Sequence, residues 1–330
     1  MTPWLRRALA VGLGLLAACR STGPTGGGAP PACQELSGGT RLTTGDGVSL
    51  WFKVIEGSAT ADTLLYLHGG PGHHSLDFER AVAGQLRGRL VLMDQRGCGR
   101  SQLGPGSAVG LEPTVEDVER VLEATQTQRA VLVAHSFGAS VAVAFARARP
   151  HLVRGIVFVD TNADTNAAFT HQLQTLAATP EFAADHPRLE ALVSSQTSVF
   201  GRLVEAYQLV GVEAAQRRLQ WHDEAARQAH RRAEAEDGLD RCTDRRVVEA
   251  YAASGHLDGQ HARELGERLP MPAVVFAGRH SQTIGPSVVR DADAWGAGLV
   301  WFEQSAHFPF LEERPRFVAE LERFVATLPP

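Results

Sequence analysis

The sequence contains no block of lysine or arginine residues and no close grouping of cysteines with histidines. Acidic and basic side chains are interspersed along its 330 residues, and the formal net charge is only −5. A nucleic-acid-binding protein concentrates positive charge, so this pattern argues against that class. The 13 histidines are scattered without the spacing of zinc ligands. We therefore expect no metal, no cofactor and no nucleic-acid partner.

The chain also lacks an apolar run long enough to cross a bilayer permanently. Its apolar segment ALAVGLGLLAA follows a short basic segment and ends in LAAC at residues 16–19, which is typical of a lipoprotein signal peptide. We predict residues 1–19 to be that signal, with Cys19 as the lipidated residue. We expect residues 20–39 to be a flexible tether that connects an exported protein to the membrane of a bacterial cell envelope. An ordinary secretory signal is the alternative.

Cysteine is scarce, with four residues in the whole chain. If Cys19 is lipidated, Cys33, Cys98 and Cys242 remain, and an exported protein can oxidise a pair of them. Cys98 lies within a motif described below. We therefore predict that any disulfide joins Cys33 to Cys242.

Short β-branched runs alternate with helical stretches between residues 40 and 161, and strand-like runs resume at residues 270–330. TLLYLHGG, RLVLMDQRG, AVLVAHS and GIVFVD are apolar on both faces, as strands of a covered parallel sheet must be. The helix over PTVEDVERVLEATQ is expected to start at Pro113, with a capping box formed by Thr114 and Asp117. This alternation predicts an α/β fold with a doubly wound, mostly parallel sheet.

Residues 162–269 differ in composition, since they are rich in Ala, Arg, Glu and Gln and contain almost no β-branched run. We expect this segment to be helical. The simplest architecture is a sheet domain, formed by residues 40–161 and 270–330, that is interrupted by a helical cap.

The strongest chemical motif is VLVAHSFGAS, in which a predicted strand ends at His135 and a helix starts after Ser136. A nucleophile elbow needs this strand, turn and helix, because the sharp turn lifts the serine hydroxyl out of the sheet. Gly138 keeps the turn free of clashes, and Ala134 stands at the other small position. We predict that Ser136 is a nucleophile and that the N–H of Phe137 is one oxyanion donor.

Two glycine-rich loops precede the elbow. HGGPG at residues 68–72 lets a backbone N–H, near Gly70, approach a substrate carbonyl as the second oxyanion donor. His68 is expected to brace this loop rather than to transfer protons. In DQRGCGRS we expect Asp94 and Arg96 to pair with each other and to support the loop.

The general base is expected after the last strand, where WFEQSAHFPF supplies His307. The loop after Gly278 normally carries an acid in this arrangement, but this chain has no carboxylate there, and Ser281 occupies the place. A neutral hydroxyl cannot stabilise an imidazolium. Asp160, at the end of the strand that follows the elbow helix, is the substitute, with Asp164 as a lesser competitor. Otherwise Ser136 and His307 act as a dyad.

These motifs resemble the α/β-hydrolase superfamily and, within it, the proline iminopeptidase branch. The resemblance rests on HGGPG, DQRGCGRS, the elbow at Ser136 and AHFPFLEERPRF around His307. It implies a serine nucleophile, a histidine base, a helical cap, and cap carboxylates that bind the amino group of a peptide. Phe137 stands where the family usually has Trp, and Ala134 where it usually has Gly.

Three hypotheses of function follow. The first is a serine hydrolase that acts through an acyl-enzyme and releases an N-terminal residue from peptides, as proline iminopeptidases do. The second is a lipoprotein esterase or lipase-like hydrolase with the same machinery. The third is a catalytically impaired binding protein of the same fold.

Overall fold

One sheet organises the protein. The computed structural model describes residue 33 and residues 38–58, 62–259 and 262–329. Eight described strands form a sheet in the order β1-β2-β4-β3-β5-β6-β7-β8. The first two strands pair antiparallel, β2 is antiparallel to β4, and all later pairs are parallel. The strands are β1 (Thr40–Thr43), β2 (Ser49–Ile55), β3 (Thr63–Leu67), β4 (Arg89–Met93), β5 (Ala130–His135), β6 (Val153–Val159), β7 (Ala273–Gly278) and β8 (Gly298–Phe302).

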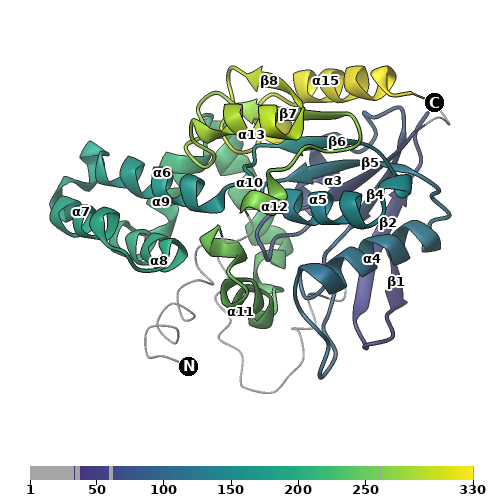
Figure 1. Ribbon diagram of the computed structural model, residues 1–330, viewed down its shortest axis with the longest axis horizontal. Coiled ribbons are helices and arrows are strands. Elements are labelled where there is room, and N and C mark those ends of the chain that lie inside the picture. The colour runs from purple at the N-terminus through teal and green to yellow at the C-terminus, as the bar shows by residue number, and fades with distance from the viewer. Residues whose placement is uncertain (1–32, 34–37, 59–61, 260–261, 330) are drawn as a thin grey trace.

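Helices cover both faces of the sheet and form a separate group between β6 and β7 (Figure 1). The helices on the sheet are α3 (Leu76–Val82), α4 (Leu111–Ala124), α5 (Gly138–Ala148), α13 (Ser287–Trp295), α14 (Pro309–Glu312) and α15 (Arg314–Thr327). Those between β6 and β7 are α6 (Thr165–Ala177), α7 (His186–Ser194), α8 (Val199–Val210), α9 (Val212–Gln220), α10 (Glu224–Asp237), α11 (Arg245–Ala253) and α12 (Ala262–Leu265).

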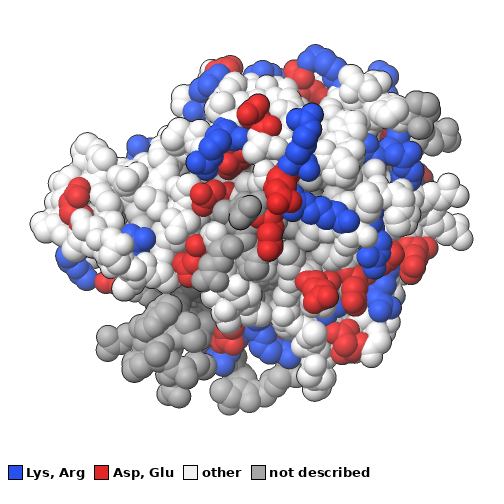
Figure 2. All heavy atoms as spheres, viewed as in Figure 1, with Lys and Arg blue, Asp and Glu red and all other residues white. Residues whose placement is uncertain are grey.

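Two apolar clusters sandwich the sheet, which is why its strands read as continuous apolar runs. Strand β5 shows the arrangement: Leu132 faces the cluster beneath α4, α5 and α13, and Val133 faces the cluster beneath α3 and α15. Both residues are fully buried. The predicted α/β fold with a mostly parallel sheet is confirmed. Over the face shown in Figure 2, acidic and basic side chains are interspersed.

The start of α4 differs from the prediction. The helix begins at Leu111 with Gly110 as its N-cap, and no side chain caps it. Thr114 instead donates its hydroxyl to the carbonyl of Gly110 at 2.7 Å, and Asp117 pairs with Arg96. The predicted capping box is wrong because a buried arginine from another loop takes the carboxylate.

The helices between β6 and β7 lie beyond the carboxyl ends of the strands (Figure 1). Helices α6, α7, α8, α9 and α11 share an apolar cluster, which includes Leu173, Leu203 and Leu219 together with Phe137 from the predicted elbow. Phe137 packs edge-on against Tyr251 of α11, with ring centroids 4.7 Å apart. We call the described residues 162–259 and 262–269 the cap, and Phe137 of the elbow packs in its apolar cluster.

Two further connections hold the cap in place. Cys33 and Cys242 form the predicted disulfide, and Cys98 is buried outside any disulfide. The N–H of His307 donates to the carbonyl of Gln220, at the end of α9, at 2.9 Å.

Within the described residues, no helix has both the length and the apolar character that crossing a membrane requires. Cys19, the predicted lipidation site, lies outside the described residues.

A group of ionisable side chains joins α10 to the loop and helix that follow β3. We call it the cap–core cluster; it comprises His73, Asp77, His230 and Glu234. His73 Nε2 lies 3.1 Å from Asp77 Oδ2, and the ring of His230 lies between Asp77 Oδ1 at 3.6 Å and Glu234 Oε1 at 3.3 Å. Each helix therefore contributes a carboxylate to one shared histidine.

The charges of the cap–core cluster follow from its burial. Burial alone disfavours an imidazolium, but Asp77 and Glu234 outweigh it and raise the pKa of His230 to about 8. The pKa of His73 is raised as well, against its own burial, by Asp77. Burial acts to raise the pKa of Asp77, yet His230 and His73 bring it well below its usual value. At neutral pH the cluster holds two carboxylates and at least one imidazolium.

This arrangement predicts that the protein loses stability as the pH rises through 8. The pKa of His230 is about 8 in the folded protein and 6.5 in the unfolded chain. The His230 imidazolium therefore makes its full contribution to the free energy of unfolding below pH 6.5 and loses it as the pH rises through 8. We expect the free energy of unfolding to fall by about 2 kcal/mol as the pH rises through 8, measured by urea denaturation. His230→Gln should reduce this loss to the part that His73 contributes, and the exposed His151→Gln should preserve it. An unfolding free energy that is flat or rising over this range contradicts the prediction.

Candidate active site

Ser136 lies in a sharp turn between β5 and α5. Its φ of 51° is in the left-handed region, which costs a residue with a side chain of order 1–3 kcal/mol. The close neighbours need glycine, because a Cβ on Gly138 would lie 2.2 Å from the carbonyl oxygen of Leu67. A Cβ on Gly69 would lie 2.9 Å from Cβ of Ser136. Ala134 is fully buried in the core beneath α5, so its methyl group is accommodated.

His307 lies in the loop between β8 and α14, and it is almost completely buried. Its backbone carbonyl accepts a hydrogen bond of 2.9 Å from His135 Nε2. Burial and the nearby His307 lower the pKa of His135 well below its usual value, so His135 is neutral and carries its proton on Nε2. Sequence reasoning gave His135 no role, but it orients the loop that carries His307.

Asp160 is the acid that reaches His307. It follows β6 with a φ of 44° and is completely buried. Its Oδ2 lies 2.6 Å from His307 Nδ1. The other carboxylate oxygen accepts the N–H of Gly278 at 3.0 Å, and the hydroxyl of Ser281 donates to Oδ2 at 2.6 Å. The residue that replaces the usual acid therefore supports the carboxylate that has moved to the neighbouring strand.

Asp164 does not reach this group. Its side chain caps α6 by accepting the N–H of Ala167 at 3.0 Å, and it lies 3.8 Å from Arg290. The competition between the two predicted acids is thus decided by distance in favour of Asp160.

Ser136 and His307 line the same pocket. Among the described residues, no hydrogen bond joins Ser136 Oγ to the His307 ring. Such bonds are often long before substrate binds, and the serine hydroxyl can rotate. Asp160, Ser136 and His307 thus lie at the carboxyl edge of the sheet, where residues from adjacent parallel strands meet.

The two predicted oxyanion donors lie in different loops, Gly70 after β3 and Phe137 after β5. Gly70 lines the pocket, and Phe137 is the N-cap of α5. Neither backbone N–H is taken by another group in the described part of the chain. The N–H of Gln95 donates to His68 Nε2 at 2.9 Å, so His68 Nδ1 carries the proton and donates to the carbonyl of Gly69. Burial lowers the pKa of His68 to about 4. His68 braces the loop, as predicted.

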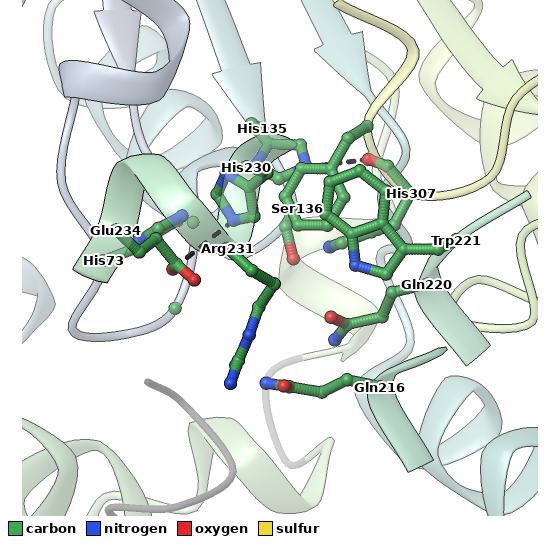
Figure 3. Close-up of a pocket in the computed structure, with 13 residues that line it drawn as sticks. His73, His135, Ser136, Gln216, Gln220, Trp221, His230, Arg231, Glu234 and His307 are labelled. Carbon is green, nitrogen blue, oxygen red and sulfur yellow. Dashed lines mark hydrogen bonds and ion pairs between the residues drawn. The ribbon is translucent and has the colours of Figure 1, made fainter. Parts of the chain in front are cut away.

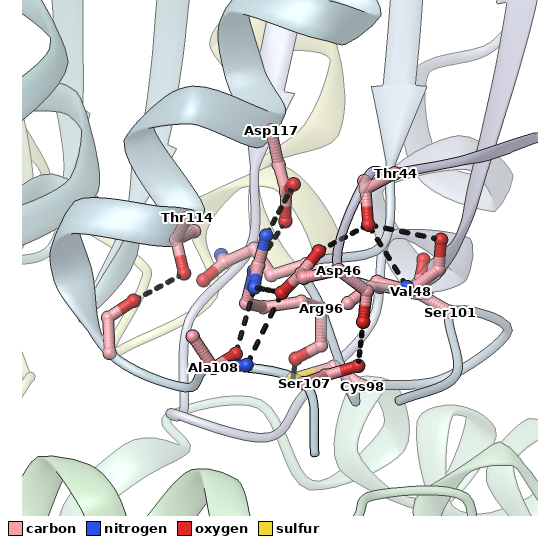
Figure 4. Close-up of polar contacts among 12 residues, drawn as sticks. Thr44, Asp46, Val48, Arg96, Cys98, Ser101, Ser107, Ala108, Thr114 and Asp117 are labelled. Carbon is pink, nitrogen blue, oxygen red and sulfur yellow. Dashed lines mark hydrogen bonds and ion pairs between the residues drawn. The ribbon is translucent and has the colours of Figure 1, made fainter. Parts of the chain in front are cut away.

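The partners predicted for Asp94 and Arg96 are wrong. Arg96 makes two hydrogen bonds of 2.7 Å to Asp117 and one of 2.9 Å to Asp46 (Figure 4). Asp94 instead binds Arg100 at 2.7 Å and the hydroxyl of Ser75. The pairs Arg96–Asp117 and Asp94–Arg100 are buried, and none of these four residues lines the pocket, which agrees with a structural role.

The pocket lies between the elbow and the cap, and it contains about 720 Å³ of empty space, part of it open to solvent. Figure 3 shows its side chains converging from α9, α10 and the loops of the sheet domain. The lining is mainly polar, which the sequence did not reveal. It consists of Gly69, Gly70, His73, His135, Ser136, Gln216, Gln220, Trp221, His230, Arg231, Glu234, His307 and Phe308.

The cap–core cluster forms one wall of this pocket through His73, His230 and Glu234. Two sets of side chains have donor atoms within 4.8 Å of one another, namely His73, His74 and Asp77, and Asp77, His230 and Glu234. Such donors can bind a transition metal. In the second set, however, the ring of His230 already faces both carboxylates. His230 therefore already provides a cationic partner for these two carboxylates.

Comparison with known proteins agrees with the fold. A model of the alpha/beta hydrolase fold matches residues 62–314. An sn-1-specific diacylglycerol lipase of Danio rerio is 29% identical over 140 residues, which cover 42% of this chain and 43% of the lipase. A proline iminopeptidase of Neisseria meningitidis is 32% identical over 105 residues, which cover 31% of this chain and 33% of that enzyme. The chain thus aligns with less than half the length of either relative.

A solved structure extends the similarity to most of the chain. A proline iminopeptidase-related protein of Thermus thermophilus superposes with a TM-score of 0.73 at 22% identity. The match covers 88% of this chain and 97% of that protein, and at this identity it is evidence for the fold alone. Because the family match covers strands β3 to β8 and the cap between β6 and β7, this chain belongs to the alpha/beta hydrolase fold family.

Proposed function

We propose that the protein is a serine hydrolase that acts through an acyl-enzyme formed on Ser136. His307 Nε2 takes the hydroxyl proton while Ser136 Oγ attacks the substrate carbonyl, and the oxyanion is held by the N–H groups of Gly70 and Phe137. His307 then gives the proton to the leaving amine or alcohol. A water, deprotonated by the same histidine, releases the acyl group and restores Ser136.

The observation that carries this proposal is the 2.6 Å contact between Asp160 Oδ2 and His307 Nδ1. A carboxylate in this position keeps the proton of the neutral imidazole on Nδ1, so that Nε2 is free to act as a base. It also stabilises the imidazolium that forms during attack. The N–H of Gly278 and the hydroxyl of Ser281 keep the carboxylate oriented.

We further propose that the substrate is a peptide with a free N-terminal amino group. Glu234 brings a cap carboxylate into the pocket that contains Ser136. Although burial acts to raise it, the pKa of Glu234 is lowered by His230, so the carboxylate is ionised at neutral pH and attracts an ammonium. Similarity to a proline iminopeptidase supports the same reaction.

A carboxylester hydrolase is the second candidate. The similarity to a diacylglycerol lipase supports it, as do the stacked rings of Trp221 and Phe308 on the pocket wall, with centroids 4.6 Å apart. Turnover of prolyl arylamides against short acyl esters separates the two candidates. A chain that fails to react with a fluorophosphonate would be the impaired binding protein instead.

Substitutions in the proposed triad test the mechanism. Ser136→Ala should abolish fluorophosphonate labelling and reduce turnover far below a thousandth of wild type. Asp160→Asn should lower kcat by about ten thousand-fold, because His307 loses its orienting acid. Ser281→Ala should lower kcat by about tenfold, since it removes one hydrogen bond to the Asp160 carboxylate. Steady-state kinetics with an arylamide or ester provide the measurement.

Asp164→Asn is the matched control for Asp160→Asn, because both carboxylates lie on the segment between β6 and α6. It should keep near-full activity. If Asp160→Asn does so as well, Asp160 is only a structural residue and the enzyme operates as a dyad of Ser136 and His307.

The free-amine preference depends on Glu234. Glu234→Gln should raise KM for an alanyl or prolyl arylamide by about ten- to a hundredfold, because a charge-assisted contact with the ammonium is lost. The exposed Glu236→Gln, on the same helix, should leave KM unchanged. Equal effects of Glu234→Gln on N-acetylated and free-amine substrates would reject Glu234 as the amine site.

We propose, finally, that the enzyme is exported and attached to a bacterial membrane through a lipid on Cys19. The proposal rests on LAAC at residues 16–19 and the Gly/Pro-rich tether after it. Wild-type protein should sediment with membranes, and Cys19→Ser should stay unprocessed or appear in the soluble fraction. Mass spectrometry that finds an unlipidated mature N-terminus in the wild type overturns the proposal.

A further inference from the structure

Arg231 is the one charged side chain of the described pocket lining that has no ionic partner in the described part of the chain. It lies on α10, is half-buried and lines the pocket. Two nearby charges on the helix are paired, since Arg227 binds Glu224 and Glu213, and Glu234 faces His230. An arginine is charged at every physiological pH. A guanidinium without a counter-ion in a partly buried pocket is therefore poised for an anionic ligand.

The placement of Arg231 suits a second contact with the substrate that Glu234 binds. The two residues are three positions apart on α10, so their backbones are about 4.5 Å apart along the helix axis. Figure 3 shows the Arg231 side chain extending away from Glu234 toward the part of the pocket lined by Gln216. The cap thus places the Glu234 carboxylate and the Arg231 guanidinium in the same pocket, and the two side chains point away from each other.

We propose that Arg231 binds the C-terminal carboxylate of a short peptide, which makes free dipeptides the preferred substrate class. This inference rests on the proposed aminopeptidase function and on Glu234 as the amine site. Two extended residues span about 7 Å, which exceeds the rise of about 4.5 Å between the two positions on the helix and therefore accommodates charged ends that point apart (Figure 3). The planar guanidinium can hold both carboxylate oxygens at once, and the Gln216 amide is available to donate beside it.

An ester substrate with a phosphate or a second carboxylate would offer Arg231 the same negative charge as the C-terminus of a peptide. A comparison of ligands that differ only at the C-terminal group isolates the peptide hypothesis. The dipeptide Pro-Ala and its C-terminal amide share the ammonium, the scissile bond and the side chains. They differ only in the C-terminal carboxylate. Among the described lining residues, Arg231 is the cation outside the cap–core cluster, and it is placed to bind this carboxylate.

The test measures binding in the Ser136→Ala protein by calorimetry, so that turnover does not intervene. Pro-Ala should bind about ten- to a hundredfold more tightly than its amide. Adding Arg231→Gln should reduce that ratio to about one, and Arg231→Lys should restore part of it. Arg232→Gln is the matched control, because this exposed neighbour carries the same charge on the same helix, and it should keep the ratio.

Three results would overturn the inference: equal binding of acid and amide, a ratio that survives Arg231→Gln, or no binding of either dipeptide. The proposed function is judged separately, by turnover of prolyl arylamide in the wild-type protein. That substrate has no carboxylate, so active arylamide turnover with equal dipeptide binding rejects the role of Arg231 and leaves the aminopeptidase proposal standing.

Discussion

The contact between the carboxylate of Asp160 and the ring of His307 is the interaction on which the rest of the site depends. It exists because β5, β6 and β7 lie side by side and parallel, so the ends of these strands deliver their side chains to one edge of the sheet. Ser281, on the loop after β7, completes the arrangement by donating its hydroxyl to Asp160. A carboxylate in place of Ser281 would face that of Asp160 and repel it; the hydroxyl at 281 and the acid at 160 therefore form a consistent pair.

The cap contributes charged side chains of both signs, Glu234 and Arg231, to the lining of the pocket. The contact between His230 of α10 and Asp77 of α3 links the cap to the sheet domain, which positions the lining side chains of α10 in the pocket that contains Ser136. In this account the sheet performs the chemistry common to the family, and α10 selects the substrate. That division agrees with relatives of one fold that include a peptidase and a lipase.

Sequence patterns were sufficient for features that depend on neighbouring residues. The strands, the elbow at Ser136 and the post-strand position of His307 follow from local runs and chain order. The sequence left Asp160, Asp164 and a dyad without an acid as alternatives, and only the fold shows which carboxylate contacts His307. The patterns failed where a partner comes from elsewhere in the fold, as with Arg96, which binds Asp117 rather than Asp94. Glu234 was invisible for the same reason: α10 contains several glutamates, and only the packing of the cap decides which one enters the pocket.

Proton NMR of the hydrogen on His307 Nδ1 tests the central claim most directly. A proton shared with a buried carboxylate at 2.6 Å is protected from solvent and strongly deshielded, so wild-type protein should give a distinct low-field resonance. Asp160→Asn should abolish it, and Ser281→Ala should shift it without removing it. A low-field resonance of His307 that persists unchanged in Asp160→Asn would contradict the account, since its proton would then be held by another group.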